Sequence, residues 1–400
     1  MSDSAATRLP ADYQYGTQRL TSPEQTLARI TPILPQVGIT RCLDITGLDC
    51  IGIPVFSAAR PHSTILQLSS GKGVTATHAR CSALMESIEL YHAENLHPER
   101  IAAWSSERAL RDAQGSDAIL RHADCPDVLS AAFDDTLRLP WIEATDLLHD
   151  RPVLIPASVA YFCQPAFNLT TTNGLASGNH PIEASLHALY ELIERDAISQ
   201  LSNATGVMRI RDRVGVVRLD TVQHAPLADL IAKIHAAGSD LVLMAVPARV
   251  DVHVFWAVLL DQHTQTAVAA LTVGFGAHTD PTIAACRAVT EAAQSRAIFI
   301  HGGREDISEK ITNQAGISSD TAAFRFFRNL PQNTDWAAVE ARINPPAGDR
   351  DLFTIHRWLV DALAASGCTT LLSHTLTRHD LDIPVVKVVA PQLRFNQKLF

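Results

Sequence analysis

The sequence predicts a mixed fold of the α/β or α+β class, with helices packed on β-sheets. Short runs rich in Val and Ile, typical of strands, stand before long helical patterns. Strands and helices do not alternate strictly, however, as they do in a doubly wound sheet. The sequence also has no G-x-G-x-x-G and no Walker A motif, which argues against the standard nucleotide-binding folds.

Residues 1–40 are expected to form an N-terminal arm and one short helix, and residues 41–400 the main domain. The segment MSDSAATRLPADYQYGT lacks the basic and apolar parts of a signal peptide, so we expect a loose arm there. Ser22 and Pro23 then form a helix-start signal. Residues 303–350 are polar, with clusters of Asp, Asn and Pro, and predict a surface insertion.

The other elements follow from hydrophobic periodicity and turn residues. Three long helices are expected, over residues 75–95, from 181 to about 199, and after the glycines near residue 276. Shorter helices are expected near 226–236 and over 351–366. Strands are expected at residues 41–46, 52–57, 64–68, 139–144, 151–156, 241–245, 252–260, 266–272, 369–375 and 385–389.

The chain is organised around the stretch from Thr172 to Ser199. Its glycines allow a tight turn close to a ligand, and Pro181 suits the first position of a helix. Apolar side chains then recur every three or four residues, which predicts a stripe that faces the core. A polar stripe runs beside it, formed by Glu183, His187, Glu191 and Glu194.

The polar stripe recurs in two other predicted helices. The patterns are A-x-x-S-A-L-x-E-x-x-E from Ala79, A-x-x-H-A-L-x-E-x-x-E from Ala184 and A-x-x-R-A-V-x-E-x-x-Q from Ala284. Each follows a glycine-bearing segment that we expect to be a loop: SSGKGVTATH, TNGLASGNHP and TVGFGAHTDP. Three copies predict three equivalent elements around one site. The aligned positions are Ser82, His187 and Arg287, then Glu86, Glu191 and Glu291, then Glu89, Glu194 and Gln294.

Carboxylates gathered in one place repel each other, and a hard divalent cation removes that conflict. Mg²⁺ favours oxygen ligands and is commonly held by a few carboxylates together with substrate phosphates. Helix N-termini and glycine segments add N–H donors for phosphate, and Lys72 and Arg287 add positive charge. The combination favours a nucleotide–magnesium site of non-Walker type. The alternative is that three amphipathic helices turn their polar faces to solvent.

Several ordered motifs resemble the YcaO family: GKGVTATHARCSALMESIE, GLASGNHPIEASLHALYELIERDA and RAVTEAAQSR, with TGLD and IGIPV nearer the N-terminus. The resemblance covers roughly Leu43 to Gly303 and, more weakly, a C-terminal segment. It implies a YcaO-type fold and ATP-dependent activation of a peptide-backbone amide. The implied product is a thioamide or an azoline, or an amidine, in a ribosomally synthesised peptide.

The resemblance also implies ATP and Mg²⁺ as cofactors. In the implied mechanism a nucleophile adds to the amide carbonyl, ATP phosphorylates the oxyanion and phosphate then leaves. Arg287 is expected to neutralise charge, and His187 is a candidate general base unless it is a hydrogen-bonded structural histidine. The implied metal ligands are Glu86, Glu89, Glu191 and Glu194, with Ser82 beside them, and further nucleotide-site positions match Lys72, Arg287, Glu291, Gln294 and Arg296.

The C-terminus departs from many azoline-forming relatives, which end in a PxPxP tail. This chain ends APQLRFNQKLF with only Pro391, which weakens an azoline assignment and leaves thioamide formation open. No fused E1-like domain is recognised, so we expect a precursor peptide and a separate E1-like or TfuA-like partner, with the TfuA-associated branch favoured. The alternatives are an accessory factor for ribosomal-protein methylthiolation and a non-catalytic ATP-binding regulatory protein.

Composition limits the other classes of protein. The formal net charge is −9 without a basic run, which argues against nucleic acid as the ligand. No apolar run reaches the length of a membrane span. The 7 cysteines form no CxxC pair or Cys/His cluster, so we expect reduced thiols in the cytoplasm rather than zinc or disulfides. A homodimer is possible for an enzyme of this size.

Overall fold

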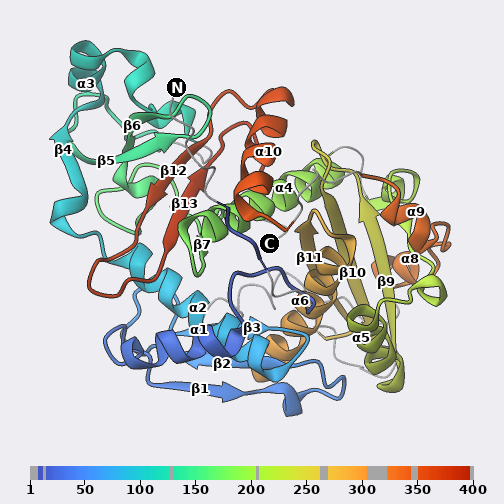
Figure 1. Cartoon of the computed structure of the whole chain (residues 1–400). Helices are drawn as coiled ribbons and strands as arrows, with labels where there is room; N and C mark the ends of the chain where they lie inside the picture. The colour runs from blue at the N-terminus through green and yellow to red at the C-terminus, as the bar shows by residue number, and fades with distance from the viewer. Residues whose placement is uncertain are drawn as a thin grey trace.

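Three β-sheets surround a central region that holds the long helices (Figure 1). This computed structural model describes residues 8–11, 15–125, 130–203, 207–261, 269–303, 322–343 and 350–396. All pairings between named strands in these ranges are antiparallel. The mixed fold without strict βαβ alternation, expected from the sequence, is therefore confirmed.

The first sheet has the strand order β1-β2-β3 and carries helices α1 and α2 on one side. The side chain of Ser22 accepts a hydrogen bond from the Gln25 backbone and completes a capping box that begins α1. Thr75 caps α2 in the same way, through His78 N. The bounds are α1 Pro23–Ile30, β1 Arg41–Asp44, β2 Val55–Ala59, β3 Leu68–Lys72 and α2 Ala76–Glu94.

The second sheet has the order β4-β5-β12-β13-β7, with β6 paired to β5. Its helices are α3, α4 and α10, and α4 packs against β7 and β13. The bounds are β4 Ile101–Ser105, α3 Glu107–Gln114, β5 Leu139–Asp146, β6 Arg151–Pro156, β7 Leu175–Ser177, α4 Pro181–Asn203, α10 Leu352–Ala365, β12 Leu372–Thr375 and β13 Val385–Val389.

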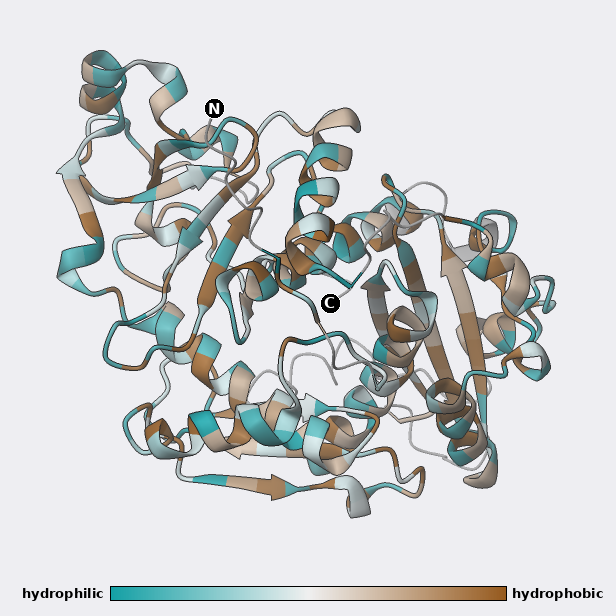
Figure 2. Cartoon of the chain, in the orientation of Figure 1, coloured by the Kyte–Doolittle hydropathy of each residue, from teal (hydrophilic) through white to brown (hydrophobic). Residues whose placement is uncertain are grey.

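The third sheet has the order β11-β10-β9-β8, and its longer strands are apolar along most of their length (Figure 2). Helices α5 and α6 pack against it. The bounds are β8 Gly215–Val216, α5 Ala225–Ala236, β9 Ser239–Val246, β10 His253–Asp261, β11 Leu271–His278, α6 Pro281–His301, α8 Ala322–Arg328 and α9 Trp336–Glu340. No helix in the described ranges is apolar and long enough to cross a membrane.

The glycine-bearing segments correct one expectation: they are not loops throughout, because each contains a strand, β3, β7 or β11. Their glycines allow the following helix to lie very close to its strand. A Cβ added at Gly71 would lie 2.0 Å from Ala83 N, and one added at Gly276 would lie 2.1 Å from Ala284 O. These two glycines occupy equivalent positions in the first and third copies.

Other boundaries also differ from expectation. The strand expected at 64–68 lies later, at β3, and β11 begins at Leu271 whereas residues 266–268 fall outside the described residues. Strand β4 was not predicted. Within 303–350 the structure describes 303, 322–343 and 350, where α8 and α9 bury Phe324 and Trp336 in the core.

The N-terminal segment is not loose where the structure describes it. Leu9 N donates to Asp351 Oδ1 at 2.6 Å, and Ala11 N donates to Arg350 O at 2.7 Å. These bonds tie the chain's beginning to the start of α10. All seven cysteines are free, as expected from their spacing.

Candidate active site

Three strand–helix units, β3–α2, β7–α4 and β11–α6, meet at the centre of the molecule (Figure 1). Each helix packs on its own strand and also on the strand of the next unit. Thus α2 contacts β7, α4 contacts β11, and α6 contacts β3. The three units close into a ring, as the repeated pattern in the sequence predicted.

The polar stripes of the three helices keep some exposure inside this ring. Between residues 183 and 199 of α4, only His187, Glu191 and Arg195 are not fully buried. Between residues 283 and 297 of α6, the same holds for Arg287, Glu291 and Ser295 only. A partly exposed residue at every fourth position of an otherwise buried helix indicates an opening between the helices rather than an outer surface. The α2 members Ser82, Glu86 and Glu89 are also partly exposed.

The side of the site between α2 and α4 is acidic. Ser177 donates to Glu89 Oε1 from its backbone N at 2.9 Å and from its hydroxyl at 2.6 Å. Burial raises the pKa of Glu89 to about 8, and although Ser177 opposes this, the carboxylates of Glu86 and Glu191 raise it further. Carboxylates from two helices far apart in the sequence therefore lie within electrostatic reach of each other.

The side between α4, α6 and β3 mixes acidic with basic groups. Lys72 Nζ lies 2.5 Å from Glu291 Oε2. Burial alone would raise the pKa of Glu291, but Lys72 and Arg195 outweigh it, so the pKa is lowered. Burial raises the pKa of Glu194 to about 7, with Arg195, 3.6 Å away, opposing the rise and Glu291 adding to it.

His187 and Arg287 form a pair across the two longest helices. Arg287 Nη1 donates to His187 Nδ1 at 3.3 Å. Burial lowers the pKa of His187 well below 6.5, and the charge of Arg287 lowers it further. The imidazole is therefore neutral, and the assignment of Nδ1 as acceptor puts its proton on Nε2. This environment suits a hydrogen-bonded partner of Arg287 better than a general base near neutral pH.

Two predicted nucleotide-site residues, Gln294 and Arg296, form hydrogen bonds to other parts of the chain. Gln294 Nε2 donates to Ser70 O and so links α6 to β3. Arg296 donates to Asp49 Oδ1 at 3.0 Å and to Asp261 Oδ2 at 2.8 Å. Arg296 lies two positions beyond Gln294, so it points to a different face of α6. The guanidinium of Arg296 is therefore part of a buried ion-pair network.

The residues of the site fit a divalent cation by their chemistry. Glu89 and Glu194 are carboxylates whose charged form is disfavoured, and a cation would remove that penalty. Among the described residues, no group of three or more His, Cys, Asp or Glu is arranged to hold a metal by itself. Phosphate oxygens or waters would have to supply the remaining ligands, as is usual for Mg²⁺.

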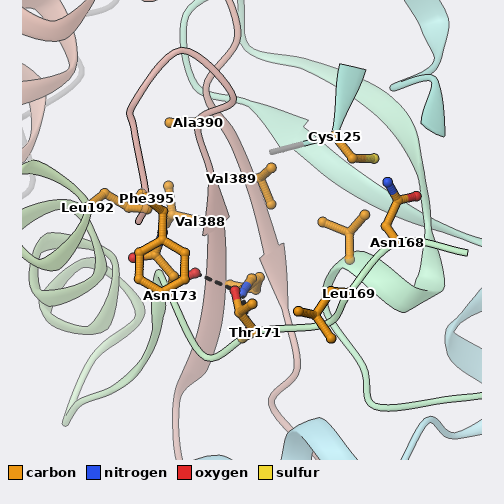
Figure 3. A pocket seen from close by; sticks show the side chains of 12 residues that line it. Cys125, Asn168, Leu169, Thr171, Asn173, Leu192, Val388, Val389, Ala390 and Phe395 are labelled. Atoms are coloured by element: carbon orange, nitrogen blue, oxygen red, sulfur yellow. Dashed lines mark hydrogen bonds between the residues drawn. The ribbon is translucent and has the colours of Figure 1, made fainter. Parts of the chain in front are cut away.

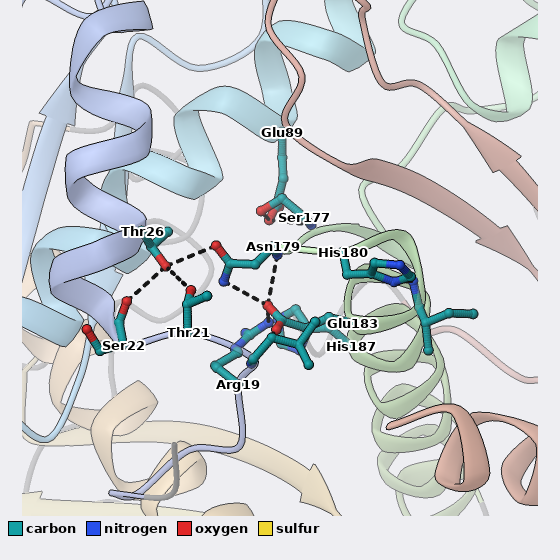
Figure 4. A network of polar contacts seen from close by, with 12 residues as sticks. Arg19, Thr21, Ser22, Thr26, Glu89, Ser177, Asn179, His180, Glu183 and His187 are labelled. Atoms are coloured by element: carbon teal, nitrogen blue, oxygen red, sulfur yellow. Dashed lines mark hydrogen bonds and ion pairs between the residues drawn. The ribbon is translucent and has the colours of Figure 1, made fainter. Parts of the chain in front are cut away.

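Sequence reasoning missed the contribution of the N-terminal arm. Arg19 Nη1 lies 3.3 Å from Glu183 Oε1, at the start of α4 (Figure 4). Asn179 Oδ1 accepts from Thr26 Oγ1 of α1 at 3.1 Å. The only sequence signal was Glu183, which belongs to the polar stripe but was not among the predicted ligands.

A small cavity is lined by residues of α4 and β13, among them Leu192 and Val388 (Figure 3). Lys387 lines it and donates to Thr171 O at 2.6 Å and to Asn173 O at 2.7 Å. The cavity volume of about 20 Å³ is enough for about one water molecule, so it does not hold the nucleotide.

Known proteins similar to this chain support the same interpretation. A Methanothermobacter thermautotrophicus protein is 35% identical over 384 residues, which span 93% of this chain and 94% of that protein. A Rhizobium leguminosarum bv. trifolii protein from the tfuA 3′ region is 32% identical over 400 residues, spanning 94% and 89%.

Two solved structures share the fold. YcaO from Methanopyrus kandleri, bound with AMPPCP and Mg²⁺, matches with a TM-score of 0.73 at 24% identity, covering 96% of this chain and 95% of that chain. A heterocyclase in complex with substrate and cofactor matches with a TM-score of 0.78 at 22% identity, covering 97% and 54%. The model of the family described as YcaO cyclodehydratase, ATP- and Mg²⁺-binding, matches residues 70–394. The chain therefore belongs to the YcaO family, whose cofactors are ATP and Mg²⁺.

Proposed function

We propose that this protein uses ATP to phosphorylate the oxygen of a peptide-backbone amide and so prepares that carbonyl for replacement of its oxygen. The observation that supports this most is the division of the site into an acidic side and a charge-compensated side. Phosphoryl transfer needs alignment and neutralisation of charge more than covalent chemistry from the protein. A site with both kinds of charge suits that task.

The residues divide the work as follows. Glu86, Glu89 and Glu191 would hold the cation, with Glu194 as a fourth ligand. When bound, Mg²⁺ neutralises the triphosphate and orients it. Lys72 and Arg287 would neutralise the negative charge that develops on the transferred phosphoryl group. His187 orients Arg287 through the 3.3 Å hydrogen bond to its Nη1.

For the product we favour a thioamide over an azoline. The Rhizobium relative comes from the tfuA 3′ region, which supports a TfuA-like partner for this chain as well. The proposed reaction exchanges the amide oxygen for sulfur. Hydrosulfide adds to the carbonyl carbon, the γ-phosphoryl group of ATP is transferred to the amide oxygen, and the C–O bond breaks, so that the oxygen leaves as phosphate. The products are the thioamide, ADP and hydrogen phosphate, which takes up the proton of the hydrosulfide.

The test is reconstitution of the full chain with a co-encoded precursor peptide, a TfuA-like partner, ATP, Mg²⁺ and sulfide, read out by mass spectrometry. We expect a peptide in which one oxygen has been exchanged for sulfur. The same mixture with Glu191→Gln should give far less of this product, whereas Glu143→Gln, at an exposed position of β5, should behave as wild type. Loss of water instead of exchange would indicate an azoline, and an unmodified peptide with every co-encoded partner would contradict the proposed activity.

A further inference from the structure

The N-terminal arm, defined here as residues 15–21 (Figure 1, dark blue), contacts two of the three units of the site. Gly16 packs against the segment before α2: a Cβ added to it would lie 2.9 Å from Val74 Cγ1. Arg19 and Leu20 bind Glu183 at the start of α4. The arm is also held beyond both ends, by α1 after it and by the contacts of Leu9 and Ala11 at α10 before it.

Glu183 is the anchor of this arm. Its side chain is 3% exposed and accepts four hydrogen bonds (Figure 4). Oε2 accepts from Leu20 N at 2.8 Å, and Oε1 accepts from Arg19 Nη1 at 3.3 Å. Asn179 supplies the other two donors to Oε1, its backbone N at 3.0 Å and its Nδ2 at 3.2 Å. A buried carboxylate is thus satisfied by the arm and by the residue just before α4.

The anchored arm affects the third unit through charge. Burial is the main cause that lowers the pKa of both His187 and Arg287, and the positive charge of Arg19 lowers both further. Its guanidinium is therefore within electrostatic reach of the His187–Arg287 pair although the two lie on different helices. Release of the arm would remove one positive charge from this side of the site and open it to water.

We propose that Glu183 is a positioning residue that holds the arm across the site, and that tight binding of a magnesium nucleotide depends on this closure. The proposal rests on the nucleotide site of the proposed function but not on its peptide product. Because a pre-ordered wall lowers the ordering cost of binding, release of the arm is expected to weaken nucleotide affinity about ten-fold.

The test compares Glu183→Gln with wild-type full-length protein. A glutamine keeps the shape of the side chain but puts an NH₂ group against one of the N–H donors. We expect faster hydrogen–deuterium exchange in the arm, and weaker binding of Mg²⁺–AMPPNP by calorimetry. Glu183→Asp, which keeps the charge, should recover part of both. Asp124→Asn is the matched control, because Asp124 forms an exposed ion pair with Arg121 and contacts neither the arm nor α1.

Three outcomes would overturn the proposal. They are unchanged exchange in Glu183→Gln, faster exchange with wild-type nucleotide affinity, and a loss of affinity equally large in Asp124→Asn. If Glu183→Gln does not fold, Arg19→Gln removes the same ion pair from the partly exposed arm and should give the same two changes. A wild-type protein that binds the nucleotide but modifies no peptide would contradict the proposed product while leaving this inference intact.

Discussion

The two sides of the site use the same repeated helix face for different purposes. Between α2 and α4 the last two aligned positions of each helix are carboxylates, and the pKa of Glu89 is raised to about 8. Between α6 and β3 the third copy has Arg287 and Gln294 at positions equivalent to Ser82 and Glu89, and Lys72 neutralises Glu291. The acidic side thus suits a bound cation, whereas the other side already contains positively charged side chains. A three-fold pattern has been made asymmetric by a few substitutions.

The largest effect is expected where the two sides meet. Glu191 raises the pKa of both Glu89 and Glu194, so it lies between the acidic and the compensated side. We expect Glu191→Gln to lower magnesium-dependent turnover by about 10²–10³-fold, since a charge-stabilising group is lost. Its melting temperature should stay near wild type, because removing repulsion among carboxylates does not destabilise the fold. Normal turnover in this variant would contradict the metal site.

The substitution Lys72→Ala tests the side of the site between α6 and β3, where Lys72 neutralises Glu291. The variant removes the partner of Glu291 and one positive charge from the site. We expect nucleotide affinity to fall about 10-fold or more, because a charge-assisted contact to phosphate is lost. Isothermal titration with Mg²⁺–AMPPNP measures this directly. An unchanged affinity would mean that Lys72 serves only to neutralise Glu291.

The acidic side predicts a pH dependence in the absence of metal. The pKa of Glu89 is about 8 in the folded protein and near its usual 4.5 when unfolded. The folded state therefore holds more protons, and this contribution to stability is present below about pH 4.5 and lost as the pH rises through 8. We expect the contribution to be a few kcal/mol, to be absent in Glu89→Gln, and to be offset by added Mg²⁺. Thermal melts from pH 5 to pH 8, with and without Mg²⁺, test this; a metal-free trend that is the same in Glu89→Gln would assign it to other groups.

The smallest effect is expected at His187. Because its pKa is lowered well below 6.5, it does not titrate between pH 6 and 8. We expect His187→Ala to slow turnover less than about ten-fold and to leave the pH profile of kcat unchanged over that range. A much larger loss of rate with an unchanged melting temperature would identify His187 as the base.

Local sequence patterns predicted much of the secondary structure. The caps at Thr75 and Asp280 and the proline at Pro181 set the starts of the three long helices, because capping depends only on residues a few positions apart. The polar stripes were visible for the same reason, since helical periodicity is a local property. The misplaced strands β3 and β11 contain glycines, which hide the alternation typical of strands.

The sequence alone determined that this chain has three polar helix faces of the YcaO type, because about eleven consecutive residues are enough to define each face. Only the tertiary structure decided which of those residues meet. Lys72 and Glu291 are 219 positions apart, and Arg19 and Glu183 are 164 apart. It also paired Arg296 with two aspartates and brought Arg19 of the N-terminal arm to Glu183 at the start of α4. Such contacts depend on how strands and helices pack across the whole chain, and no local pattern records that packing.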